Sequence, residues 1–401
     1  MGEVDGYVCF SAQDWWYHNR AHSDFQLMRR VAEARPVLLV NSIAMRMPLP
    51  GRSTKPLRRI IRKARSMAKR LQQPVPELPG FHVLTPVLLP LYGSAAGRAL
   101  NARLVAWQVR SACRKLGLDA PVCIVTIPTA ADVVRHVPHR RLVYNRSDLH
   151  SAFTETDQEQ IRTLERSLLS GADAVLYVSR SLMEAERELT GDRAHFLDHG
   201  VDVEHFRRRG PEEEPPDLAT VPHPRIGFFG GLDSYLVDFD LLERVGREIA
   251  EAHLVLVGDA DCSMARFEAL PNVHWLGYRP YEDIPRYGSG FDVAVMPWLR
   301  NAWIEHANPI KLKEYLALGL PVVSTDFPEV RHYQEWVDVA ADPDEFVGYL
   351  RKALRDPGDG AGAGAAERRE YVRHATWDAR AHELMELCES LPADRRRPAD
   401  R

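Results

Sequence analysis

The sequence predicts an α/β protein built from two parallel-sheet domains of similar size. Its 401 residues are enough for two or three domains that each bury a core. Short apolar segments alternate with helical ones along the chain, which is typical of parallel strands joined by right-handed crossover helices. Residues 207–224 are rich in proline and charge and lack apolar periodicity. Such a composition indicates an exposed linker, and it divides the chain near its middle.

The first half contains six apolar segments that we expect to form strands. They are Tyr7–Phe10, Val37–Asn41, Val122–Ile127, Leu142–Tyr144, Ala174–Val178 and Ala194–Leu197. The loop after the first strand of an open α/β sheet faces the ligand crevice. An aromatic ring packs on the C–H face of a sugar while a carboxylate binds its hydroxyls, so this loop is a candidate acceptor site. Its residues are Gln13, Asp14, Trp15 and Trp16. Interdomain packing of the two tryptophans is the alternative.

Residues 51–71 combine a helical apolar stripe with many cations. The basic side chains are Arg58, Arg59, Arg62, Lys63, Arg65, Lys69 and Arg70. No acidic residue lies between Arg52 and Arg70, whereas an ordinary solvated helix face mixes both signs. A basic amphipathic helix of this kind can lie in an anionic bilayer surface. A helix packed on the core and a nucleic-acid patch are the alternatives. The apolar stretch 84–93 either adds membrane contact or is a buried strand.

Two further observations in the first half concern charge and chemistry. Asp148 and His150 follow a predicted strand at its C-terminal end, where an acid could take a proton from an acceptor hydroxyl or simply cap a helix. Residues 1–200 hold 28 Lys and Arg against 19 Asp and Glu, while the rest holds 24 against 37. A basic half beside an acidic half suggests that one face meets an anionic surface.

The second half repeats the alternation of strands and helices. The expected strands are Arg225–Phe229, Leu254–Val257, Val273–Leu276, Asp292–Met296, Pro321–Thr325 and Val337–Ala340. Gly230 and Gly231 follow the first of these strands, and Gly258 follows the second. Glycines at strand ends let backbone amides approach a phosphate closely, although any tight turn uses them too.

The helix expected from Ile310 to Leu318 is the centre of the functional argument. Asn308 can cap it and Pro309 can occupy its first position, so its free amides and dipole favour an anion. Lys311 and Glu314 share one face near this end, and Arg300 is another cation nearby. A cation suits a phosphate and a carboxylate suits sugar hydroxyls, so together they suit a diphosphate attached to ribose or another sugar. A capped surface helix with a Lys–Glu pair is the alternative.

The stretch from Asn308 reads NP-x-K-x-x-E-Y-L-A-x-G-x-P-V-V and resembles the donor-binding signature of family 4 glycosyltransferases of the GT-B fold. That signature has two glutamates separated by seven residues. Glu314 falls on the second, which holds the donor ribose in the family. His306 stands at the first position, which contacts the transferred sugar. Asp148 matches one acid of the family's YDxxDDxxxF pattern, and Tyr278 and Arg279 correspond to the loop that meets the base.

The resemblance implies a GT-B fold of two Rossmann-like domains that face each other across a cleft. The expected parts are an acceptor domain at 1–206, the linker at 207–224, a donor domain at 225–370, a final helix at 371–392 crossing back to the first domain, and a disordered tail at 393–401. The donor site would comprise Gly230, Gly231, Gly258, Tyr278, Arg279, Arg300, His306, Asn308, Pro309, Ile310, Lys311 and Glu314.

The implied activity is a retaining, metal-independent hexosyl transfer from a nucleotide sugar, with no cofactor, to a saccharide hydroxyl in envelope or exopolysaccharide synthesis. The basic stripe favours a lipid-linked acceptor, such as a polyprenyl-diphosphate intermediate, and a cytoplasmic protein peripheral to the membrane. Two alternatives stay open. One is a nucleotide-sugar 2-epimerase; the other is a non-catalytic partner in polysaccharide assembly, favoured by His306 and by the lack of a basic pair after Gly231.

Overall fold

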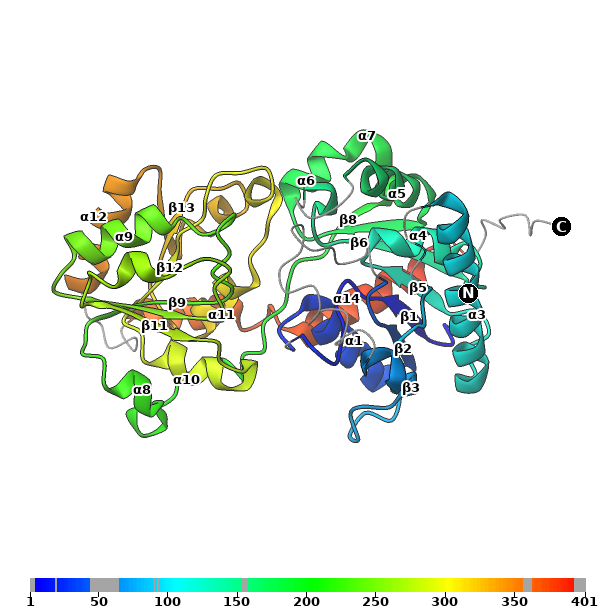
Figure 1. The fold of residues 1–401 in the computed structure, drawn as a ribbon, viewed down its shortest axis with the longest axis horizontal. Coiled ribbons are helices and arrows are strands. Elements are labelled where there is room, and N and C mark those ends of the chain that lie inside the picture. Colours follow the sequence, from blue (N-terminus) through cyan, green and yellow to red (C-terminus); the bar gives the residue numbers. More distant parts are fainter. Residues whose placement is uncertain are drawn as a thin grey trace. The chain divides into compact units, whose positions relative to one another are not determined.

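The computed structural model describes residues 4–18, 20–43, 65–89, 91, 94–152, 158–355 and 363–392. The chain forms two compact units (Figure 1), Met1–Asp198 with Arg380–Arg401, and His199–Ala379. Residues 207–224, the expected linker, therefore fall inside the second unit. They include helix α8 (Pro216–Ala219), and Leu218 and Val221 are buried. Two apolar side chains in a charged stretch thus attach it to a core, a signal that its composition hid.

The first unit is built on an eight-stranded sheet in the order β3-β4-β2-β1-β5-β6-β7-β8. The strands are β1 (Tyr7–Phe10), β2 (Val37–Val40), β3 (Leu71–Gln72), β4 (Phe81–Leu84), β5 (Val122–Val125), β6 (Arg141–Arg146), β7 (Ala174–Tyr177) and β8 (Ala194–Phe196). Every pairing is parallel except that of β3 with β4. The chain adds β2 and β4 on one side of β1 and then returns to β5 on the other side. The topological switch point therefore lies between β1 and β5.

Helices connect these strands, as the alternation of segments predicts. They are α1 (Ser23–Ala34), α3 (Ala95–Leu116), α4 (Ala131–Val134), α5 (Gln158–Gly171), α6 (Arg180–Ala185) and α7 (Arg187–Thr190). The longest is α3, which begins at Ser94, whose hydroxyl accepts a bond from Gly97 N, and ends at Gly117 with φ 70°. The last helix is α14 (Trp377–Ser390), and its residues from Arg380 onward belong to the first unit. Glu389 of this helix forms an ion pair with Arg35 at 3.6 Å.

The basic segment predicted as a helix over 51–71 lies mostly outside the described residues. Arg58, Arg59, Arg62 and Lys63 are among the residues not described. Residues 65–69 are helical, and Arg65, Lys69 and Arg70 are exposed. The helix ends earlier than predicted because Arg70 adopts a positive φ of 48° and Leu71 enters β3.

The second unit contains a six-stranded sheet in the order β11-β10-β9-β12-β13-β14, parallel throughout. The strands are β9 (Arg225–Phe229), β10 (His253–Val257), β11 (Val273–Gly277), β12 (Val293–Met296), β13 (Val322–Thr325) and β14 (Val337–Ala340). Its other helices are α9 (Phe239–Glu248), α10 (Ile284–Ser289), α11 (Ile310–Ala317), α12 (Pro343–Arg355) and α13 (Ala363–Val372). The chain runs β9, β10, β11 in one direction and then places β12 on the other side of β9, so the switch point lies between β9 and β12. The predicted α/β class is confirmed in both units.

A buried ion network fixes the end of β6 in the first unit. Arg146 is 1% exposed and donates to Glu186 Oε1 at 2.8 Å and to a carboxylate oxygen of Glu165. Tyr177 Oη donates to Glu186 Oε2 at 2.8 Å, and Ser151 N donates to Glu165 at 3.2 Å. The charges are paired and hydrogen-bonded, which is the condition for burying them. The network joins β6, β7, α5 and the loop that carries Asp148.

Arg146→Met should lower the free energy of unfolding by about 3–5 kcal/mol, because it leaves two buried carboxylates without their cation. Urea unfolding followed by circular dichroism measures the change. Arg187→Met is the control: Arg187 pairs with Glu184 on an exposed helix surface, and its loss should cost no more than about 0.5 kcal/mol. Equal effects of the two changes would contradict a stabilising role for the network.

Candidate functional site

The predicted donor-site residues gather at the switch point of the second sheet. Gly230 follows β9, Gly258 follows β10, and α11 begins after the loop that leaves β12. Both glycines have positive φ, 137° and 155°. A Cβ on Gly258 would overlap Gly230 O, and a Cβ on Gly230 would collide with Lys311 Nζ. Because neither glycine has a side chain, the two backbone turns and the Lys311 ammonium group can approach one another closely. A side chain at either glycine would occupy that space.

Lys311 reaches this point from the first turn of α11. Its Nζ lies 4.4 Å from the ring centroid of Phe228 and 4.5 Å from that of Trp298, so two aromatic faces hold the cation. Burial lowers the pKa of Lys311 to about 8, while Glu314 and Asp233 act in the opposite direction. The ammonium is thus charged at neutral pH and is close to titration. It is suited to an anionic ligand that restores its charge.

Glu314 lies one turn further along α11 and is 6% exposed. Burial raises its pKa to about 8, and only the attraction of Lys311 is found to oppose this. The carboxyl group is therefore mostly protonated at neutral pH and can donate as well as accept a hydrogen bond. The next residue, Tyr315, is also buried, and its hydroxyl accepts a bond from Phe229 N at 3.1 Å. That bond ties α11 to the end of β9.

Helix α11 begins at Ile310 as predicted, but the residue that precedes it as the cap differs from the prediction. Pro309, with ψ 120°, is the residue before the helix, and Ile310 is its first helical residue. No side chain caps this end, so the expected cap by Asn308 is wrong. The reason is that Pro309 is extended and moves Asn308, which is buried, out of the capping position. The first amides of the helix thus lack a side-chain cap, which leaves them suited to a ligand anion.

Two acidic residues near Lys311 were missed by the sequence analysis. Burial and the neighbouring Asp261 raise the pKa of Asp233, while Lys311 opposes this. Asp261 accepts from Ser234 N at 2.8 Å and from Ser234 Oγ at 3.2 Å, which fixes the loop after Gly231. Asp233 stands in the run LDSYLVD, where the sequence analysis noted only the lack of cations, and Asp261 follows Gly258 by three residues. A diphosphate bound here would favour the protonated form of Asp233.

Other predicted donor residues point elsewhere. Arg300 is exposed, donates to Ala341 O at 2.8 Å and lies 3.9 Å from Asp326, so its side chain is directed to the end of β14. Arg279 donates to Tyr287 Oη at 2.6 Å and pairs with Asp217. These contacts hold both cations in structural pairs that sequence spacing does not reveal.

Three other members of the predicted donor set, Gly231, Tyr278 and His306, keep accessible positions. Tyr278 is exposed after Gly277, whose φ is 72°. His306 is half-buried in a short 3-10 helix, Ile304–His306, which Asn301 organises by accepting from the amides of Trp303 and Ile304 at 3.0 and 2.9 Å. The roles of Tyr278 and His306 stay predictions.

The predicted acceptor loop of the first unit is more buried than expected. Trp15 is 2% exposed and packs against Phe25 and Phe81 at 5.1 and 4.9 Å between centroids. It therefore belongs to the core and cannot present a face to a sugar. Asp14 is buried and accepts from Ser66 Oγ at 2.8 Å.

Trp16 is half-buried and donates from Nε1 to Thr85 Oγ1 at 3.1 Å, with Lys69 Nζ 3.8 Å above its ring. Gln13 is half-buried and lies close to it in the sequence. Since Lys69 comes from the basic segment, that segment and the predicted acceptor loop are in direct contact.

Asp148 and His150 follow β6 as predicted. Arg146 Nη1 donates to Asp148 O at 2.8 Å, so the buried network positions this turn. His150 is 2% exposed, and burial together with the neighbouring Arg146 lowers its pKa to about 3. The imidazole is neutral at physiological pH, and its burial places it behind Asp148, which is half-buried.

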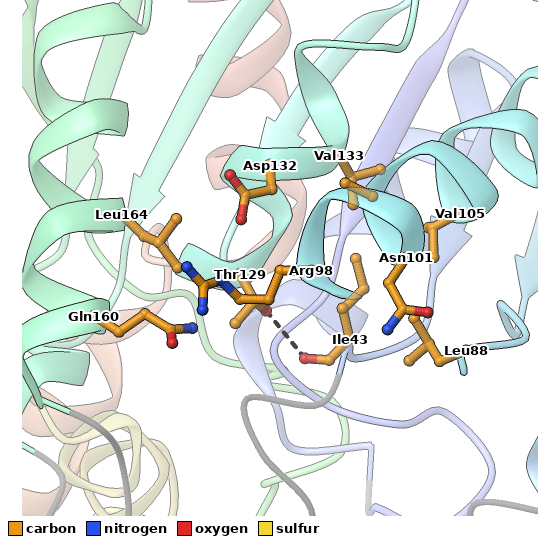
Figure 2. A pocket seen from close by; sticks show the side chains of 11 residues that line it. Ile43, Leu88, Arg98, Asn101, Val105, Thr129, Asp132, Val133, Gln160 and Leu164 are labelled. Carbon is orange, nitrogen blue, oxygen red and sulfur yellow. Dashed lines mark hydrogen bonds between the residues drawn. The ribbon is translucent and has the colours of Figure 1, made fainter. Parts of the chain in front are cut away.

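A small hollow of about 40 Å³, open to solvent, lies beside α3 in the first unit. Figure 2 shows the guanidinium of Arg98 reaching across it toward Gln160 and Leu164 of α5. Its lining residues are Ile43, Leu88, Arg98, Asn101, Ala102, Val105, Thr129, Asp132, Val133, Gln160 and Leu164. Thr129 Oγ1 donates to Ile43 O at 3.0 Å across its floor, joining the ends of β5 and β2. Apolar walls with a polar rim suit an amphipathic molecule. Sequence patterns gave no sign of this hollow, because its residues come from several separate segments.

Comparisons with known proteins agree with this arrangement. The chain aligns with sucrose-phosphate synthase from Thermosynechococcus elongatus at a TM-score of 0.72 and 16% identity, over 96% of this chain and 99% of that one. It aligns with HepE of Anabaena, solved in complex with UDP and glucose, at a TM-score of 0.67 and 14% identity, over 97% and 100%. The chain has the GT-B fold. The predicted GT-B architecture is therefore confirmed.

Sequence comparisons also find similar proteins. Residues 223–356 match the family described as "Glycosyl transferases group 1". Over 268 residues the chain is 26% identical to a protein named for teichuronic acid biosynthesis, the glycosyltransferase TuaH of Bacillus subtilis strain 168. The match spans 61% of this chain and 66% of that relative, just under two thirds of its length. The family match contains Gly230, Gly258, Lys311 and Glu314.

The affinity for UDP should fall as the pH rises from 7 to 9. Lys311 loses its proton in this range, since its pKa is about 8, so its attraction for a diphosphate declines, and the dissociation constant should rise by up to roughly tenfold. Isothermal titration calorimetry at fixed ionic strength measures this. Lys311→Met should weaken binding about 10–100-fold at pH 7, as expected for loss of a charged hydrogen bond, and should make the pH profile shallower, leaving the dependence that comes from Glu314, whose pKa is also about 8. Arg300→Gln is the control and should leave both unchanged. A profile that stays steep in Lys311→Met would assign the titration to another group.

Proposed function

We propose that the protein is a glycosyltransferase that moves a hexose from a nucleoside-diphosphate sugar to a hydroxyl of a saccharide acceptor during synthesis of a cell-envelope polysaccharide. One observation carries the proposal. At the switch point of the second sheet, an ammonium group stands over two glycine turns beside an uncapped helix start, with a buried carboxyl one turn onward. The match to group 1 glycosyl transferases covers this point, and a structure of the same fold binds UDP and glucose.

In this proposal the second unit binds the donor. The first amides of α11 and the Lys311 ammonium bind the diphosphate, and Glu314 exchanges hydrogen bonds with the ribose hydroxyls. When the bond between the sugar and the phosphate breaks, negative charge grows on the leaving diphosphate. Groups that are already oriented toward that charge stabilise the transition state without reorganisation. A pKa of Lys311 near 8 in the free protein means that the ammonium gains more from the added charge than an exposed lysine would.

The acceptor and the stereochemistry rest on the resemblance to family 4. By that resemblance the transfer retains the anomeric configuration and uses no metal, and Asp148 takes the proton that the acceptor hydroxyl loses as the new glycosidic bond forms. The first unit binds the acceptor. Support comes from the open hollow beside α3 and from the accessible Trp16 and Gln13.

We also propose a peripheral location on the inner face of the plasma membrane. The first 200 residues carry the excess of cations, and the exposed Arg65, Lys69 and Arg70 continue the basic segment. None of the helices in the described ranges is long and apolar enough to cross a membrane. Attraction of cations to anionic lipid would hold the enzyme near a lipid-linked acceptor.

Thermal-shift screening against UDP-, GDP- and dTDP-sugars tests the donor site, because a ligand at 100 times its dissociation constant stabilises a protein by about 2.7 kcal/mol. The stabilising donor is then incubated with lipid-linked saccharides and the labelled sugar is followed. Transfer to the acceptor, reduced about 100-fold or more by Lys311→Met, is the expected result. Conversion of the donor to its 2-epimer without an acceptor would establish the epimerase instead. Binding of no donor would favour a non-catalytic partner.

A further inference from the structure

The outer face of α3 and the adjoining loop 85–91 expose an unusual amount of apolar surface. Ten large apolar side chains are exposed in the described part of the chain, and half of them lie here. They are Val87, Leu89, Leu91, Leu100 and Trp107. Trp107 is 62% exposed, the highest value of the ten. We name these five residues, with the arginines described below, the α3 face. A contiguous exposed apolar patch marks an interaction site more often than scattered single residues do.

Two side-chain amides hold the loop in this exposed conformation. Gln108 Oε1 accepts from Val87 N at 2.9 Å and its Nε2 donates to Val87 O at 3.0 Å. Asn101 repeats the pattern two turns earlier, accepting from Leu89 N at 2.8 Å and donating to Leu89 O at 2.9 Å. Each amide thus pairs with the backbone as a neighbouring strand would. Between them, Leu88 is buried and lines the hollow on the inner side of α3.

This clamping explains why the apolar side chains cannot collapse onto the core. With Leu88 directed inward and both flanking residues bonded through their backbones, Val87 and Leu89 must point outward. Four hydrogen bonds to the backbone hold Val87 and Leu89 in place, although their exposed apolar side chains interact unfavourably with water. The loop is therefore built to present apolar groups to another phase or molecule.

The charged residues of α3 indicate which kind of partner this face binds. The helix carries five basic residues and no acidic one, namely Arg98, Arg103, Arg110, Arg114 and Lys115. At 100° per residue, Arg103, Arg110 and Arg114 fall on the same side as Leu100 and Trp107. Here exposed cations alternate with a tryptophan and leucines, which is the pattern of a surface that lies at the boundary between lipid headgroups and acyl chains.

We propose that the α3 face docks onto an anionic lipid bilayer, with Trp107, Leu100 and the loop side chains entering the headgroup region and the three arginines binding lipid phosphates. This inference rests on the proposed peripheral location, but it uses a different element from the basic segment at 51–70. Each basic residue near an anionic surface adds roughly fivefold to partitioning, so three arginines add about 100-fold.

Vesicle flotation tests the proposal with the full chain. The vesicles are phosphatidylcholine alone or with about 30% of phosphatidylglycerol, which gives an anionic surface that attracts basic side chains. Wild type should float with the anionic vesicles and should lose binding in about 0.5 M salt, where screening shortens to a few ångströms. Arg103→Glu with Arg110→Glu, and separately Leu100→Ser with Trp107→Ser, should each reduce the bound fraction at least tenfold.

The matched control carries the same changes on another exposed surface of the same unit. Arg162→Glu with Arg187→Glu gives the same change of net charge, and Leu189→Ser removes an apolar side chain of similar exposure on α7. These variants should float like wild type. Reversing Arg58, Arg59, Arg62 and Lys63 to Glu measures the basic segment separately, and a loss confined to that variant would overturn the proposal for the α3 face.

Two readouts distinguish insertion into lipid from self-association through the α3 face. Quenching of tryptophan fluorescence by brominated acyl chains should be smaller in Trp107→Phe than in wild type, and equal quenching would overturn the proposal. Light scattering reports self-association: a dimer that Trp107→Ser dissociates, with flotation unchanged, would assign the face to a second copy of the chain. UDP stabilisation should persist in every α3 variant, so a failure of docking is distinguishable from a failure of the proposed donor site.

Discussion

The placement of the Lys311 ammonium is the constraint on which the donor site depends. It needs two aromatic faces beneath it, a residue without a Cβ at position 230, and a helix that starts beside the end of β9. Parallel topology supplies the last condition, because the order of the strands reverses between β9 and β12 and the loop that leaves β12 leads into α11. The bond from Phe229 N to Tyr315 Oη then sets the distance between α11 and the sheet. A small change in any of these contacts moves the cation.

Electrostatics at this point are balanced rather than strongly positive. Burial shifts the pKa values of Lys311 and Glu314 toward each other, both to about 8, and it also raises the pKa of Asp233. Burial thus opposes the charged form of each of these groups in the free protein, and an anion bound beside them would favour their protonated forms.

Much of the fold could be predicted from local patterns, and the failures have physical causes. Gly319, with φ 77°, ends α11 as its position predicted, and both switch-point glycines follow their strands. The short strand β4 was missed because the apolar run 84–93 masked the strand before it, and residues 85–89 of that run form a loop in which Val87 and Leu89 are exposed while Thr85 and Leu88 are buried. Trp15 was assigned to the acceptor loop together with Trp16 because two adjacent tryptophans in a loop carry no mark of which ring is buried. Arg279 was assigned to the base because sequence spacing cannot show its pairing with Asp217, 62 positions earlier.

The α3 face offers an explanation for the unequal distribution of charge along the chain. An anionic surface attracts the first 200 residues, which have more cations than acids, and repels the remainder, which has more acids. That field orients the chain but does not hold it, since exposed charges are screened within about 8–10 Å at physiological salt. Insertion of apolar groups supplies a contact that salt does not screen. Asn101 and Gln108 keep the loop groups exposed by committing two amide side chains of α3 to the loop backbone, and that commitment is understandable only if the loop contacts something other than water.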